Sequence, residues 1–253
     1  MTWPFSWRGF RPRVPANDRI ARLRKLLDRA NTDYSRDFPE VTLQALPATA
    51  PPKRLPRLEL QPFRCPLPSS ARIALLEGGF LPDRDVREFA IADMAGLQNY
   101  APEVLVLPLG IALSLADQKE RGLVKLPSLS TAVVVLTSLG DSPLEDHHRE
   151  LLWKAFRVPI FEQLLGWDGA IIARECEVHD GLHIEETAAI LHLQGEELLA
   201  TQLTTFTEPI VRARTGLAGE IATAHCECGA ETPRLRNLTA LRANVTAAAT
   251  GRR

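Results

Sequence analysis

The pattern of apolar and polar positions predicts an amphipathic helix near the start of the chain. Between residues 18 and 30 the apolar side chains recur at the three- and four-residue spacing of one helical face: Ile20, Leu23, Leu26, Leu27 and Ala30. Asn17 precedes this stretch and can accept a hydrogen bond from the first free N–H groups of the helix. Basic side chains fill most other positions, which is typical of a solvated helix face.

The middle of the chain alternates between two kinds of pattern. Short apolar runs predict strands at 72–77, 104–107, 132–136, 158–161 and 170–173, and helical spacing covers 83–97, 110–120 and 142–156. The run at 132–136 has no polar interruption, as expected of a parallel strand covered on both faces. In the third helix, Ser142 and Glu145 would form a capping box, with Pro143 at the first helical position. This order predicts an α/β protein with a helix-flanked, mostly parallel sheet.

A smaller antiparallel β region is expected after this sheet. The runs 188–193, 197–201 and 209–214 read as strands, with a turn at Gln194-Gly195. The pattern divides the chain into five parts: an irregular tail at 1–16, the N-terminal helix and a proline-rich connector at 17–68, an α/β domain at 69–168, the β region at 169–236 and a C-terminal tail at 237–253. The C-terminal tail is expected to be a frayed helix or disordered.

The first sixteen residues combine aromatic, proline and arginine side chains. Trp3, Phe5, Trp7 and Phe10 alternate with prolines and arginines. Such a tail can pack over its own domain, or it can dock onto a partner, because Trp and Arg are favoured interface anchors.

The composition argues against several classes of protein. The 253 residues carry a net charge of −1, with 45% hydrophobic and 24% charged residues. The chain has no excess of basic residues, so its charge does not suggest nucleic acid or an anionic membrane as a partner. Four cysteines in a chain of this length do not form a disulfide framework, so we expect a cytoplasmic protein. The longest apolar run, 104–116, is interrupted by Pro108 and too short to span a bilayer, and no secretory signal is recognisable.

Three cysteines and four histidines fall between Cys176 and Cys228. A tetrahedral structural zinc site needs four nitrogen or sulfur ligands, which Cys176, His183, Cys226 and Cys228 would supply. Either His179 or His225 could replace His183, and buried free cysteines are also common core residues. These residues therefore define a candidate zinc site, with Gly229 allowing a tight turn beside it.

Signatures of the common enzyme classes are missing: there is no GxSxG, HExxH, GxxxxGK[ST] or GxGxxG sequence. Arg212 and Arg214 alternate on an expected strand and would face the same side, where they could bind an anion.

Several stretches together resemble the phenylacetate–CoA ligase-like branch of the adenylate-forming superfamily. These stretches are VPIF at 158–161, IIAREC at 171–176, HDGLHI at 179–184, EELLAT at 196–201, PIVRARTG at 209–216, CECG at 226–229 and PRL at 233–235, with weaker similarity at 100–105 and 133–141. The family activates carboxylic acids with ATP as acyl adenylates and transfers the acyl group to coenzyme A. Many members hold a structural zinc, and that pattern falls on the same three cysteines and His183.

The sequence departs from this family where ATP would bind. The family's phosphate loop is rich in Ser, Thr and Gly, and here its only candidates are Pro68-Ser69-Ser70 and Glu77-Gly78-Gly79. The family's Tyr-Gly-x-x-Glu motif falls on LLGWD at 164–168, so Asp168 stands in place of the magnesium-binding Glu. The ribose-binding Asp falls on Leu217, and Arg214 remains in a degenerate motif. The chain also stops before the family's C-terminal domain and its lysine.

The resemblance therefore implies a truncated pseudoenzyme. The main hypothesis is a non-catalytic, zinc-containing binding or assembly subunit with a protein partner. The alternatives are an active acid–CoA ligase or adenylating subunit that a partner chain completes, and a binder of small acyl ligands near 164–168.

Overall fold

The computed structural model describes residues 16–53, 63, 65–66, 71–77, 79–80, 85–204 and 208–241. Within them lie the helices α1 (Ala16–Arg29), α2 (Pro39–Ala45), α3 (Met94–Tyr100), α4 (Leu109–Glu120) and α5 (Asp146–Phe156). The strands are β1 (Ile73–Leu76), β2 (Val86–Phe89), β3 (Val104–Pro108), β4 (Ala132–Ser138), β5 (Ile160–Leu165), β6 (Ile171–Glu175), β7 (Leu182–Ile184), β8 (Ala189–Gln194), β9 (Glu197–Gln202), β10 (Ala213–Ala222) and β11 (Arg234–Ala240).

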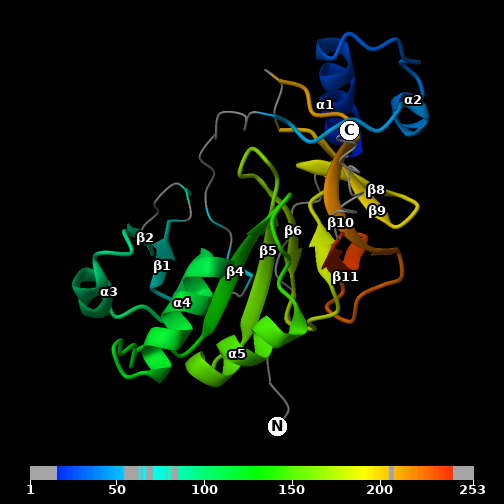
Figure 1. Ribbon diagram of the computed structural model, residues 1–253. Helices are drawn as coiled ribbons and strands as arrows, with labels where there is room; N and C mark the ends of the chain where they lie inside the picture. Colours follow the sequence, from blue (N-terminus) through cyan, green and yellow to red (C-terminus); the bar gives the residue numbers. More distant parts are fainter. Residues whose placement is uncertain are drawn as a thin grey trace, which may run out of the picture.

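One mixed sheet passes through the molecule, with the strand order β2-β1-β3-β4-β5-β6-β7-β11-β10-β9-β8 (Figure 1). The pairings from β2 to β5 are parallel, and those from β5 to β8 are antiparallel. The expectation of a mostly parallel sheet is therefore wrong, because most of the described pairings are antiparallel. The change of direction occurs at residues 166–170, which join β5 to β6 and are too few for the crossover that a parallel pair requires.

The parallel half is covered on both faces, as its uninterrupted apolar runs indicate. Leu105 and Leu107 of β3 pack with α4 and α5 in one core cluster, while Val104 and Val106 face a second cluster on the other side. Figure 1 shows α4 and α5 lying along the parallel strands, and α1 with α2 at the other end of the molecule, near β8 and β9. The apolar stripe of α1 packs there, with Leu23, Leu26 and Leu27 in contact with the end of the antiparallel half.

Some local expectations were wrong. The stretch 83–97 contains the edge strand β2 and the start of α3, where the side chain of Asp93 accepts a hydrogen bond from the N–H of Gly96 at 2.9 Å. Helix α5 begins at Asp146 rather than at Pro143, because Glu145 and His148 form the capping box. Strands β7 and β11 were not expected from the pattern, and β11 continues to Ala240, past position 236.

Residues 1–15 of the tail expected at 1–16, the final residues 242–253 and the phosphate-loop candidate Pro68-Ser69-Ser70 lie outside the described residues, as does Gly78 of the second candidate, whereas Ala16 begins α1. Among the helices that the structure describes, none combines the length and the apolar character needed to cross a membrane.

Candidate metal centre

Three cysteines and one histidine meet where β6, β7 and β11 lie side by side. Cys176 directly follows β6, His183 is the central residue of β7, and Cys226 and Cys228 lie in the turn that precedes β11. Strand β7 pairs with both β6 and β11. The sheet therefore brings together Cys176 and Cys226, which are 50 residues apart in the sequence.

The four side chains lie close enough together to share one metal ion. Sγ of Cys176 lies 3.7 Å from Sγ of Cys226, and Sγ of Cys228 lies 3.3 Å from Nε2 of His183. All four ligand atoms lie within 4.8 Å of one another. Zinc–sulfur bonds of about 2.3 Å and zinc–nitrogen bonds of about 2.0–2.1 Å place tetrahedral ligands about 3.5–3.8 Å apart. Three thiols and an imidazole are soft donors that suit zinc better than magnesium or calcium, so the residues fit a zinc ion.

Among the three candidate histidines, His183 is the one that belongs to this cluster. Its Nδ1 lies 3.0 Å from the hydroxyl of Thr232, which can accept a hydrogen bond from Nδ1–H and so leave Nε2 free to bind a metal. His179 instead places Nδ1 3.1 Å from Oε1 of Glu175 and stacks on Phe161. His225 is exposed to solvent.

Burial disfavours the thiolate form of these cysteines in the absence of a cation. Burial raises the pKa of Cys176 to about 12 and also raises the pKa of Cys228. The pKa of Cys226 is lowered: burial acts to raise it, but hydrogen bonds from the backbone N–H of Cys228 and from the neighbouring thiols outweigh that effect. A bound cation would supply the positive charge that stabilises all three thiolates.

A buried arginine holds the two ligand-bearing turns together. Arg234 opposes His183 in the pairing of β7 and β11, and its side chain is only 3% exposed. The guanidinium forms an ion pair with Asp180 in the first turn, and in the second turn it donates to the backbone oxygen of Ala224 at 3.1 Å and of His225 at 3.4 Å. The sequence pattern did not identify this role, because β11 is mostly polar and only Leu235 is buried beside Arg234.

Two glycines permit the turns around the site. Gly181 has φ +87°, and a Cβ atom there would lie 2.4 Å from the backbone oxygen of Leu235. Gly229 has φ +79°, and its N–H donates to the oxygen of Cys226 at 2.9 Å, as the expected tight turn requires.

The residues at the ligase family's nucleotide positions have other contacts here. Asp168 is 6% exposed, and its carboxylate accepts hydrogen bonds from the side chains of Gln202 and Thr204 and, at 3.1 Å, from the N–H of Ala170. Leu217 is buried in the core of the antiparallel half.

The two arginines expected on one strand have different surroundings. Arg212 lies just before β10, is buried, and contacts His192 and, at 3.3 Å, Gln194. Arg214 is exposed and forms an ion pair with Glu197. The two guanidinium groups therefore do not form a shared anion site.

Sequence comparisons give no match, neither to a protein-family model nor to a curated protein. Comparison with solved structures does find a similar fold. 2-Hydroxyisobutyryl-CoA ligase in complex with 2-HIB-AMP and CoA, in the thioesterification state, matches with a TM-score of 0.53 and 10% identity, over 74% of this chain and 45% of the ligase chain. An open conformation of the same ligase matches with a TM-score of 0.51 and 12% identity, over 60% of this chain and 41% of the ligase chain.

At this identity the likeness concerns the fold alone, and the chain spans less than half the length of the ligase chains that it matches. It agrees with the fold that the sequence resemblance implies and does not separate the phenylacetate–CoA ligase-like branch from others. The chain thus has a fold that resembles part of 2-hydroxyisobutyryl-CoA ligase, together with a candidate Cys3His metal site.

Proposed function

We propose that the chain is a non-catalytic, zinc-containing relative of an adenylate-forming ligase and serves as a binding or assembly subunit. The observation that carries this proposal is the saturation of the Asp168 carboxylate. Gln202, Ala170 and Thr204 donate to it, so both oxygens are engaged inside the protein. A magnesium ligand needs a carboxylate oxygen that is free to face the ion and the nucleotide phosphates.

A second position supports the same proposal. Leu217 falls where the resemblance places the ribose-binding aspartate, and it is 1% exposed. An aliphatic side chain cannot accept hydrogen bonds from the two ribose hydroxyls. Both changes remove contacts to ATP while preserving the packed scaffold.

The proposed zinc would be structural. Cys176, His183 and Cys226 are each at most 5% exposed, and four protein ligands complete a tetrahedron. A catalytic zinc keeps one position open for water or substrate, whereas this donor set is closed. The ion would therefore connect β6, β7 and the turn before β11 without contacting a substrate.

A binding role is supported by two exposed apolar side chains of α5. Leu151 and Trp153 project from different sides of the helix and are 50% and 54% exposed. Exposed aromatic and aliphatic side chains on one helix are typical of residues that a partner covers.

Two measurements on the purified full chain test the proposal. Titration calorimetry with Mg·ATP should show no binding, and a pyrophosphate-exchange assay across carboxylic acids should show no exchange. Micromolar ATP binding together with acyl-adenylate formation would overturn the non-catalytic assignment. Elemental analysis should find about one zinc per chain, and a Cys228→Ser variant should lose it; a metal-free protein of unchanged stability would contradict the structural zinc.

A further inference from the structure

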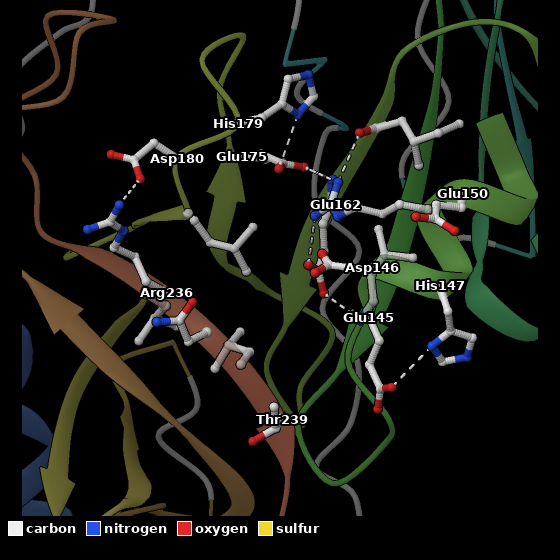
Figure 2. Close-up of a pocket in the computed structure, with 18 of the residues that line it drawn as sticks. Glu145, Asp146, His147, Glu150, Glu162, Glu175, His179, Asp180, Arg236 and Thr239 are labelled. Atoms are coloured by element: carbon white, nitrogen blue, oxygen red, sulfur yellow. Dashed lines mark hydrogen bonds and ion pairs between the residues drawn. The ribbon is translucent and has the colours of Figure 1, made fainter.

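A cleft separate from the metal cluster lies between α5 and β11, above β5, β6 and β7 (Figure 2). Its volume is about 1050 Å³, which is large enough for several side chains of a bound segment. None of the four proposed zinc ligands lines it, and neither does Asp168. The cleft therefore needs an explanation of its own.

The floor of the cleft holds two buried carboxylates that are neutralised within the protein. Arg149 reaches both, with Nη2 3.4 Å from Oε2 of Glu162 and Nη1 3.0 Å from Oε2 of Glu175. Thr137 donates to Glu162 at 2.8 Å, and His179 contacts Glu175. Burial raises the pKa of Glu162 to about 7, so this floor carries little net charge near neutral pH.

The rim along α5 carries negative charge that is not compensated. Asp146 and Glu150 are exposed and line the cleft, and neither contacts a cationic side chain within the described part of the chain. Glu145 lies beside them, with Oε2 3.3 Å from Nδ1 of His147, and it also forms the capping box with His148. Across the cleft, the charge of Asp180 is already paired with Arg236 (Figure 2).

Apolar side chains line the space between these charges. They come from the segment before α5 and from α5, β5, β7 and β11, and comprise Leu144, Trp153, Ile160, Leu182, Leu235 and Leu238. A complementary occupant would therefore combine positive charge with aromatic or aliphatic side chains.

We propose that the occupant is the chain's own N-terminal segment, residues 1–15, which lies outside the described residues. This segment contains Arg8, Arg11 and Arg13 and no acidic residue. It also contains four large aromatic side chains, Trp3, Phe5, Trp7 and Phe10. The arginines match the carboxylates of the α5 rim, and the aromatic rings match the apolar lining.

The N-terminal segment is long enough to reach the cleft of its own molecule. Helix α1 is held at Arg19, whose Nη1 lies 2.5 Å from Oε1 of Glu186. Glu186 follows the cleft residue Leu182 by four positions, which an extended chain spans in about 14 Å at about 3.3–3.6 Å per residue. Fifteen residues reach about 50 Å by the same measure. The segment can therefore enter the cleft of its own molecule.

Photo-crosslinking of the full-length protein tests this inference. With p-benzoylphenylalanine in place of Phe10, irradiation should give an intramolecular adduct that maps to α5 or β11 and whose yield does not depend on protein concentration. Adducts that map elsewhere, adducts between two chains, or no adduct at all would each overturn the proposal.

Charge variants show whether the rim recognises the segment. Asp146→Asn with Glu150→Gln should lower the adduct yield about fivefold, as expected for removing two solvent-screened charges, and so should about 1 M salt. The control, Asp85→Asn with Glu88→Gln, makes the same charge change beside β2 and should leave the yield unchanged. Equal yields from both double variants, with circular dichroism showing both folded, would refute charge recognition at this cleft.

Discussion

The structure assigns Arg234 the role of joining the two turns that carry the proposed zinc ligands, and this role can be tested by comparison with Arg236. Both guanidinium groups contact Asp180, so the two arginines share an acidic partner. They differ in burial, because the side chain of Arg234 is 3% exposed and that of Arg236 is 43% exposed. Arg234 alone also donates to backbone oxygens, those of Asp180, Ala224 and His225.

Arg234→Met keeps most of the side-chain volume and removes these hydrogen bonds. At about 1 kcal/mol for each of three bonds to backbone oxygens, we expect the free energy of unfolding to fall by about 3 kcal/mol. For a chain of this size that corresponds to a decrease in Tm of about 6–12 °C. Because the two turns would also be less well placed to share an ion, zinc affinity should fall about 10- to 100-fold.

Differential scanning calorimetry and competition with a zinc chelator measure the two effects. Arg236→Met is the matched control and should behave as an ordinary surface substitution, since solvent screens its contact with Asp180. If the two variants lost the same stability, or if Arg234→Met left zinc affinity unchanged, the proposed role of the buried guanidinium would be refuted.

Four further predictions follow from single contacts. Gly181→Ala should lower Tm strongly, because φ is +87° and the new Cβ atom would lie 2.4 Å from the backbone oxygen of Leu235. At Gly195, φ is +63° and a Cβ atom would have no atom within 4 Å, so Gly195→Ala should lower the free energy of unfolding by only about 1 kcal/mol. Thermal unfolding measures both effects. The pKa of Glu162 is raised to about 7 from 4.5, so the folded protein binds an extra proton between these values and the free energy of unfolding should fall by about 3 kcal/mol as pH rises through them. Urea titrations should show that Glu162→Gln removes this slope, and an unchanged slope would contradict the assignment. Asp168→Ala should destabilise the fold by freeing the donors of Gln202 and Thr204, without changing a calorimetric response to Mg·ATP. Chelation of zinc should increase hydrogen exchange in β6, β7 and β11 more than in β3 and β4, and uniform exchange would argue against a local structural ion.

The sequence by itself determined the local elements with strong periodicity and the residue types of the candidate metal site. The stripe of α1, the uninterrupted run of β4 and the turn at Gly195 depend on neighbours within a few residues, so the pattern predicted them. Cys176, Cys226 and Cys228 were candidate ligands because the thiols and several imidazoles fall within the same part of the chain. The spacing left three histidines open, since it does not say which imidazole the sheet turns toward the thiols.

Only the tertiary structure decided how the strands pair and which polar residues meet. The reversal between β5 and β6 depends on a short connection whose consequence appears when the partner strands are known. Strand β7 is held between β6 and β11, and β11 between β7 and β10, so their own sequences predicted little. The selection of His183, the buried contacts of Arg234 and the cleft beside α5 all join residues far apart in the chain, and local periodicity carries no information about such contacts.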